Sequence, residues 1–168
     1  NDYGQLGNGK TSKQNTLTQV KGPNGVGYLK DIIAITAGNV SSYALTKDGK
    51  VYSFGSNSYG QLGRNGNTLV PEEITTLENV TKISAGSYHS MAVTEDESVY
   101  TWGYNGNGQL GNGTTNSQYF PRKVSSLDGI IDVAVEDNTI IALNENGNVF
   151  SSGYNKYGNL GNSSTQDR

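Results

Sequence analysis

The stretch NSYGQLG, residues 57–63, is one copy of a phrase that the chain carries four times. The other copies are NDYGQLG from Asn1, NGNGQLG from Asn105 and NKYGNLG from Asn155, so the four starts lie 56, 48 and 50 residues apart. A period of this length is typical of repeat architectures, in which each unit buries its apolar face against the next one. The repeat therefore decides the fold before any local pattern does.

A second phrase recurs between these copies at a fixed distance. It reads AGNVSSYAL from Ala37, AGSYHSMAV from Ala85 and, in a degenerate form, VEDNTIIAL from Val135. Each copy starts 20 residues before the next Asn phrase, so this part of the unit has a constant length. The length varies only after the Asn phrase. Constant spacing indicates packed strands, whereas variable spacing indicates loops on the surface.

These phrases divide the chain into units. Residues 1–56 form a first repeat with about six extra residues near 22–27, where a Gly-Pro-Asn-Gly composition favours turns. Residues 57–104 form the second repeat, 105–154 a degenerate third, and 155–168 the start of a fourth. Three structural units and a fragment of another are therefore expected.

Each unit is predicted to contain four short strands. In the second repeat these are residues 71–75, 80–85, 90–94 and 99–103. The last two flank a short turn, which in the other repeats contains Asp48-Gly49 and Asn146-Gly147, the dipeptides most typical of tight hairpins. Four-stranded units of about 40–50 residues arranged radially are propeller blades. We therefore predict an all-β protein, a partial β-propeller with about three four-stranded antiparallel blades.

The Asn phrase itself is predicted to be structural. Its glycines allow backbone conformations with positive φ, its Asn and Gln side chains can bond the backbone of the turn, and its Leu can fill space between units. It lacks the Lys-Ser/Thr ending of a phosphate-binding P-loop, and no helix is expected after it. The repeat positions expected to serve the fold in this way are Gly60, Leu62, Gly63, Gly108, Leu110, Gly111, Gly158, Leu160 and Gly161.

Composition argues against several classes of protein. The chain has no Cys, which excludes disulfides and thiolate chemistry, and its 12 Lys and Arg against 15 Asp and Glu give a net charge of −3. The basic residues are scattered, whereas a nucleic-acid surface needs them clustered. No apolar run is long enough to cross a bilayer. We therefore expect no nucleic-acid partner, no membrane insertion, and neither a cofactor nor a metal.

Taken together, the phrases resemble the repeat of the regulator of chromosome condensation family. That repeat combines G-x-N-x-x-G-Q-L-G, A-G-x-x-H-(S/T) and D-G-x-V-(Y/F)-x-(W/F)-G, and the match covers nearly the whole chain. The first phrase is matched by Gly55-Ser56-Asn57 and its equivalents, the second by residues 85–90, and the third by residues 51–55 and 99–103. The resemblance implies a β-propeller, typically of seven blades.

Members of this family differ in function. They act as an exchange factor for a small nuclear GTPase, as a plant ultraviolet photoreceptor, as inhibitors of β-lactamases and as scaffolds in ubiquitin ligases. The photoreceptor role relies on clustered tryptophans, and Trp102 is the only one in this chain. Strings of such repeats also occur in bacterial surface proteins, whose composition this chain shares. The resemblance therefore favours a bacterial-type member or fragment at a secreted or cell-surface location.

Two polar features are candidates for chemistry. His89, the only histidine, aligns with Ser41 and Thr139, which favours a structural hydrogen bond over a role as general base or metal ligand. The adjacent Glu136 and Asp137 could contribute to a cation site, although degeneration of the third repeat explains them better.

A candidate binding surface comes from residues in or near the variable loops. Tyrosine beside Asn, Ser and Gly offers a large contact area with adaptable polar groups, as in antibody paratopes. Packing between blades is the alternative, and the sequence leaves both open. The residues concerned are Tyr59, Tyr104, Tyr119, Tyr154, Tyr157 and Asn24.

The sequence thus predicts a non-catalytic binding or scaffolding module that contacts a protein partner through loops on one rim of the propeller. It contains no catalytic constellation, so we do not expect an enzyme. Two alternatives remain open: carbohydrate binding in cell-surface adhesion, and nucleotide exchange as in the nuclear family member. Three blades would leave two blade faces bare, so self-association to complete the propeller is also expected.

Overall fold

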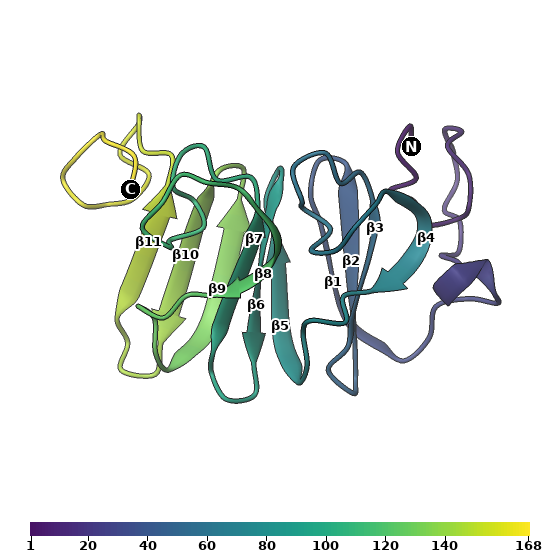
Figure 1. The fold of residues 1–168 in the computed structure, drawn as a ribbon, viewed down its shortest axis with the longest axis horizontal. Coiled ribbons are helices and arrows are strands. Elements are labelled where there is room, and N and C mark those ends of the chain that lie inside the picture. Colours follow the sequence, from purple (N-terminus) through teal and green to yellow (C-terminus); the bar gives the residue numbers. More distant parts are fainter.

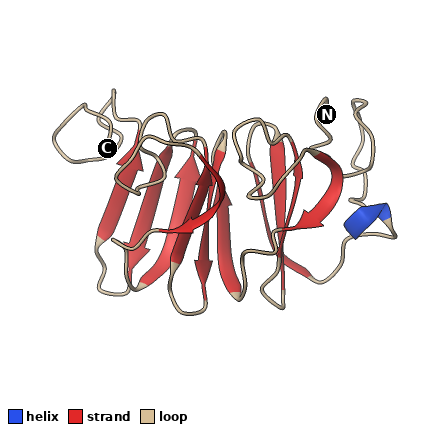
Figure 2. Ribbon diagram, viewed as in Figure 1, coloured by secondary structure: helices blue, strands red, loops and turns tan.

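The computed structural model describes the whole chain, residues 1–168, and is built of strands (Figure 1, Figure 2). Its one helical element is a single 3-10 turn, η1, at Pro23–Gly25. The molecule has no helix with the length and apolar character needed to cross a membrane. The strands are β1 (Ile32–Ala37), β2 (Ser41–Thr46), β3 (Val51–Gly55), β4 (Thr68–Glu73), β5 (Val80–Ala85), β6 (His89–Thr94), β7 (Val99–Gly103), β8 (Gln118–Lys123), β9 (Ile130–Glu136), β10 (Thr139–Asn144) and β11 (Val149–Gly153).

The strands form three antiparallel sheets that follow one another along the chain. The first sheet contains β1-β2-β3-β4, the second β5-β6-β7-β8 and the third β9-β10-β11, each in sequence order. The sheets stand side by side in a row, with the N-terminus at one end and the C-terminus at the other (Figure 1). This arrangement confirms the predicted all-β partial propeller.

The central hairpin of each sheet lies where the sequence predicts it. In the first sheet β2 pairs with β3 so that Ser41 is opposite Gly55, and the same register recurs in β6–β7 and β10–β11. Each turn contains one left-handed residue, which is Gly49 (φ 78°) in the first sheet and Gly147 (φ 81°) in the third. The second turn has Glu97 in this conformation (φ 61°), which costs a residue with a Cβ about 1–2 kcal/mol.

The outer strands pair with sheets other than the expected ones. The sequence predicts residues 71–75 as part of the unit that contains β5–β7, but β4 runs antiparallel to β3 of the preceding sheet, and β8 likewise returns to β7. The reason is the loop of the Asn phrase. This loop is short and closed on itself, so the chain returns beside the strand that it has just left. The sheets are therefore offset from the sequence repeats that start at residues 57, 105 and 155.

The two ends of the row differ from its middle. The first sheet begins at Ile32, and residues 1–31 contribute no strand to the three sheets. The third sheet lacks a fourth strand. Arg168 exchanges two backbone hydrogen bonds with Gly153, in the place where Gln118 pairs with Gly103 in the second sheet. Beyond that residue the outer edge of β11 is unpaired.

Two apolar clusters hold the sheets together, one at each contact between neighbours. In the first cluster Tyr43 meets Trp102 edge to face, with ring centroids 6.4 Å apart, and Leu45 and Val51 are fully buried beside them. The second cluster lies between the second and third sheets and consists of Met91, Val93, Val99, Val124, Ile130, Val135, Ile140 and Ala142. The middle sheet is thus buried on both faces.

The insertion of the first repeat forms a compact turn at the outer edge of the first sheet, beside β4 (Figure 1). A bridge between Lys21 and Tyr28 closes it, and the Gly22 N–H donates to the carbonyl of Gly27. Asn24 is exposed near its tip with a φ of 56°. The extra residues therefore lie on the surface of the molecule.

Leu62 lies completely buried in the loop that connects β3 with β4, so its truncation should leave a cavity. We expect Leu62→Ala to lower the free energy of unfolding by about 2–5 kcal/mol in chemical denaturation. Leu17 is fully exposed and provides the matched control, since Leu17→Ala should change the same quantity by less than about 0.5 kcal/mol. Equal effects of the two substitutions would contradict the role of Leu62 in the core.

Candidate binding surface

Each copy of the Asn phrase closes a loop around one asparagine side chain. Asn105 is fully buried; its Oδ1 accepts a hydrogen bond from the N–H of Leu110 at 2.9 Å, and its Nδ2 donates to the carbonyls of Thr114 and Asn116. The same contact at Oδ1 recurs in the other copies, at Asn1, Asn57 and Asn155. An amide suits this position because it carries a donor and an acceptor together.

The same loops join neighbouring sheets. The backbone oxygen of Gln61 accepts hydrogen bonds from the Tyr43 hydroxyl of the first sheet and from Nε1 of Trp102 in the second, the latter at 2.7 Å. The carbonyl of Leu62 accepts from the Ser53 hydroxyl at 2.9 Å. Burial raises the pKa of Tyr43 to about 12, so its hydroxyl remains a donor. The loop is therefore held by two sheets at once.

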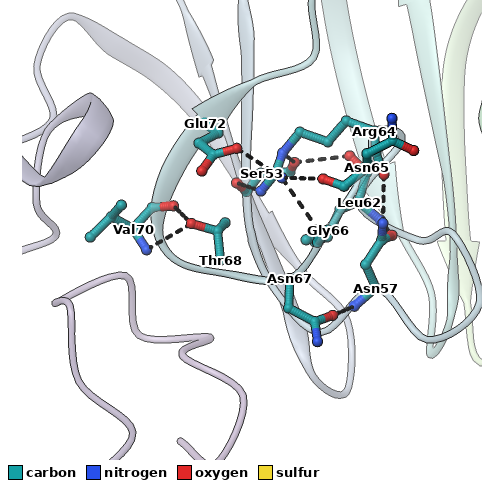
Figure 3. A network of polar contacts seen from close by, with 10 residues as sticks. All are labelled: Ser53, Asn57, Leu62, Arg64, Asn65, Gly66, Asn67, Thr68, Val70 and Glu72. Atoms are coloured by element: carbon teal, nitrogen blue, oxygen red, sulfur yellow. Dashed lines mark hydrogen bonds and ion pairs between the residues drawn. The ribbon is translucent and has the colours of Figure 1, made fainter.

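In the second loop an arginine replaces the asparagine that follows the phrase in the other three copies. Arg64 folds over the strand pair β3–β4 (Figure 3). Its guanidinium donates to the hydroxyl and the carbonyl of Ser53, and it lies 3.0 Å from the carboxylate of Glu72. Burial lowers the pKa of Arg64, and the charge of Glu72 opposes that shift. Arg64 thus ties this loop, the shortest of the series, to the strand that follows it.

Three tyrosines meet on the rim above the contact between the first and second sheets. Tyr59 lies in the second Asn loop, Tyr88 in the turn between β5 and β6, and Tyr104 directly after β7. The ring of Tyr59 packs edge-on against both others, with centroid distances of 5.1 Å to Tyr88 and 5.3 Å to Tyr104. The N–H of Tyr59 donates to Oε1 of Gln61 at 2.8 Å, which fixes its backbone.

A fourth tyrosine adjoins this group from the outer strand β8. The hydroxyl of Tyr119 donates to the carbonyl of Ser58 at 3.2 Å, and its ring is exposed. The close approach requires Gly60, since a Cβ there would lie 2.6 Å from the Cα of Tyr119. We refer to Tyr59, Tyr88, Tyr104 and Tyr119 as the tyrosine cluster. Sequence reasoning missed Tyr88; the signal was an aromatic residue where the other repeats have Val40 and Asn138.

The remaining candidate residues lie elsewhere. Tyr154 and Tyr157 form a separate pair at the C-terminal loop, with ring centroids 6.2 Å apart. Asn24 lies in the turn at the outer edge of the first sheet (Figure 1). The structure therefore brings Tyr59, Tyr104 and Tyr119 together, whereas Asn24 and the C-terminal pair are at two other places.

The profile of the Regulator of chromosome condensation (RCC1) repeat matches residues 48–93 and 96–143, more than half of the chain. A second profile with the same description matches residues 32–61 and 80–109. The chain belongs to the RCC1 repeat family. The segments matched by the first profile contain the second and third Asn loops and the strands β5, β7 and β8 in full. The segments matched by the second profile contain β1–β3 and β5–β7 and end before β8.

Relatives and solved structures extend beyond this chain. The human X-linked retinitis pigmentosa GTPase regulator is 36% identical over 77 residues, which are 45% of this chain and 7% of that protein. The crystal structure of human WBSCR16 superposes with a TM-score of 0.72 at 27% identity, covering 81% of this chain and 37% of that one. Prp20p from Saccharomyces cerevisiae has the same fold, with a TM-score of 0.74 at 24% identity over 83% of this chain and 37% of Prp20p.

Hydrogen bonds also link the turns that join the first two strands of each sheet, which are β1–β2, β5–β6 and β9–β10. The Asn39 N–H donates to the carbonyl of Ser87 at 3.2 Å, and the Ser87 N–H donates to the carbonyl of Asp137 at 3.0 Å. The Ser87 hydroxyl also donates to the carboxylate of Asp137 at 3.0 Å. Asp137 therefore joins the second and third sheets. Glu136 and Asp137 belong to no group of three or more His, Asp or Glu side chains that could hold a metal ion.

His89 is fully buried next to the third sheet, and neither of its ring nitrogens has a hydrogen-bond partner. The structural hydrogen bond predicted from its alignment with Ser41 and Thr139 is therefore not formed. The ring fits because residue 86 is glycine; a Cβ there would lie 2.6 Å from Cε1 of His89. Burial lowers the pKa of His89 to about 4, although the nearby backbone of Thr139 opposes the shift.

The role of the buried Asn105 amide can be tested by replacing its NH2 group with an oxygen. Asn105→Asp would replace the two donors with a carboxylate oxygen facing backbone carbonyls. We expect the free energy of unfolding to fall on the order of 3 kcal/mol near neutral pH, because the site then holds an unpaired buried charge. Asn116→Asp places the same charge on an exposed residue of the same loop and should be nearly neutral. Similar midpoints for both variants in urea would contradict the assignment.

His89 should make the protein sensitive to acid. Above pH 6.5 the imidazole is neutral in both states, whereas between pH 6.5 and 4 the unfolded chain binds a proton that the folded chain rejects. The resulting loss in the free energy of unfolding reaches about 3 kcal/mol at pH 4. His89→Leu removes this term, so the variant should gain about that much relative to the parent between pH 7 and pH 4 in urea titrations. A difference between the two proteins that does not change with pH would refute the lowered pKa.

Proposed function

We propose that the chain is a non-catalytic protein-binding module that contacts its partner through the tyrosine cluster. The observation that carries this proposal is the meeting of Tyr59, Tyr88 and Tyr104, which come from three separate loops of two sheets. Tyr59 is 44% exposed and Tyr119 is 50% exposed, so these rings offer contact area to a partner. Within the cluster only the Tyr119 hydroxyl is bonded inside the chain, which leaves three hydroxyls for recognition.

The hydrogen bonds that hold the loop of Tyr59 in place favour binding. Tyrosine buries a large area while it loses the freedom of few torsions, which is why it is enriched among the residues that dominate interface energies. The loop that carries Tyr59 is closed by Asn57 and bonded to both sheets through Gln61. A surface held in this way pays little ordering entropy on association.

The three segments that carry Tyr59, Tyr88 and Tyr104 have no charged residue of their own. Residues 55–63, 85–90 and 103–109, which form this part of the rim, contain no Asp, Glu, Lys or Arg. Recognition there would depend on aromatic and hydrogen-bonding contacts rather than on ion pairs. The affinity should therefore depend only weakly on salt, because screening acts on charged groups.

The RCC1 family membership is compatible with this function without specifying it. One relative is named as a GTPase regulator, which implies a protein partner for that protein. The chain covers 7% of its length, so regulation of a GTPase is not assigned to this chain. No feature of the structure favours a carbohydrate ligand over a protein partner. The experiment below distinguishes the two kinds of ligand.

Binders selected from a displayed peptide library against the immobilised chain provide the test. We expect Tyr59→Ala and Tyr104→Ala each to weaken most selected binders by roughly tenfold or more, as residues at the centre of an interface do. Tyr28→Ala is the matched control, since Tyr28 is 47% exposed but lies at the insertion. Binders that tolerate both rim substitutions would count against the proposal. Saturable glycan binding on an array, lost in the same two variants, would establish adhesion instead.

A further inference from the structure

Asparagine is followed directly by glycine at seven positions of the chain, and this dipeptide can react with itself. The backbone nitrogen of the glycine attacks the side-chain carbonyl carbon of the asparagine, and the approach is open because glycine has no Cβ. The reaction needs a glycine N–H that is free to lose its proton and an asparagine side chain that is free to turn toward it. The dipeptides start at Asn8, Asn24, Asn65, Asn105, Asn107, Asn112 and Asn146.

In four of these dipeptides the glycine N–H already donates to a backbone carbonyl, at 2.9 to 3.0 Å. The glycines held in this way are Gly9, Gly25, Gly108 and Gly147. Each hydrogen bond must break before the nitrogen can attack, which raises the barrier to the reaction. Asn24 and Asn146 are exposed, yet the glycine that follows each of them is held. Exposure alone therefore does not make an Asn-Gly pair reactive.

Two further dipeptides have a free glycine N–H but a fixed asparagine. The Asn105 side chain is fully buried, and both its oxygen and its nitrogen are bonded within its loop. Oδ1 of Asn112 accepts from the N–H of Thr114 at 3.0 Å, from its hydroxyl at 2.9 Å, and from Nδ2 of Asn105 at 3.3 Å. Neither side chain can turn toward the following glycine without losing these bonds.

Asn65 is the one asparagine of the seven with neither restraint. It lies exposed in the loop between β3 and β4, and its side chain makes no hydrogen bond within the chain. The N–H of Gly66 has no acceptor, and a Cβ at Gly66 would meet no atom within 4 Å. Nη1 of Arg64 donates to the carbonyls of Asn65 at 2.9 Å and of Gly66 at 3.4 Å (Figure 3). The two carbonyls are thus held, whereas the two groups that would react are free.

We propose that Asn65 is a site of spontaneous deamidation in the folded protein. The nitrogen of Gly66 loses its proton and bonds to Cγ of Asn65, the Cγ–Nδ2 bond breaks, and Nδ2 leaves as ammonia, so that a cyclic succinimide forms. Water then opens the ring. Opening at Cγ gives aspartate, and opening at the backbone carbonyl gives isoaspartate, in which the main chain runs through Cγ. The reaction consumes water and releases ammonia, with no change of oxidation state.

The product changes the contacts of Arg64. Either form carries a carboxylate next to a guanidinium that already lies 3.0 Å from the carboxylate of Glu72, so the new charge competes with Glu72 for it. Isoaspartate also lengthens the main chain directly after Arg64. Two residues beyond the site, Oδ1 of Asn67 accepts from the N–H of Asn57 at 2.6 Å, so the longer chain disturbs the closure of the second Asn loop. The proposal does not depend on what the tyrosine cluster binds.

Isoelectric focusing of the folded chain after incubation at mildly alkaline pH tests the proposal. A carboxylate replaces a neutral amide, so the net charge should become one unit more negative than −3 and an acidic band should grow with time. Asn65→Gln should abolish this band, because glutamine must close a larger ring and reacts far more slowly. Asn24→Gln is the matched control: Asn24 is exposed like Asn65, but the Gly25 N–H is bonded, so the band should grow as in the parent. Circular dichroism should show that both variants fold.

Peptide mapping of the same samples, digested at acidic pH to stop the reaction, locates the product. We expect Asn65 to react at least about tenfold faster than each of the other Asn-Gly sites, because those sites must first lose a hydrogen bond. In urea this preference should disappear, since every restraint is then removed. A parent chain without an acidic band, a band that persists in Asn65→Gln, a folded chain in which another site reacts as fast, or the same preference for Asn65 in urea would each overturn the assignment.

Discussion

A buried amide that supplies a donor and an acceptor at once holds each Asn loop closed, and the rest of the structure depends on that closure. The loop around Asn57 places the Gln61 carbonyl where hydroxyl and indole donors of two different sheets reach it. It also turns the chain back so that β4 pairs with β3. The pairing of strands, the spacing of sheets and the position of Tyr59 thus follow from one side chain per repeat.

The hairpins were predictable because their signals are local. Asp48-Gly49 and Asn146-Gly147 favour a tight turn whatever surrounds them, and both glycines adopt positive φ. The sheet limits were not predictable in the same way. A repeated sequence has no natural starting point, and residues 71–75 lie closer in sequence to β5 than to β3, although β4 pairs with β3. Only the three-dimensional closure of the loop decides between them.

The candidate site shows the same distinction. Tyr59 and Tyr104 border the same contact between sheets, one from each side, and the repeat alignment alone does not show that these positions are neighbours in space. Tyr88 lies in a phrase that reads as structural, so its part in the cluster was missed. His89 aligns with hydroxyl residues, but the space beside Gly86 admits an imidazole without providing a partner for its nitrogens. Alignment within the chain predicts position better than it predicts chemistry.

The two apolar clusters have a consequence for how the molecule comes apart. Each cluster joins one pair of neighbours, and no cluster joins the first sheet to the third. In such a linear array the terminal members can open while the centre remains intact, and unfolding need not be a single all-or-none event. Backbone amides in β6 and β7 are then the last to exchange with deuterated solvent, and those in β1 and β11 the first. The stability of this chain should therefore be highest in the middle sheet and fall toward both ends of the row.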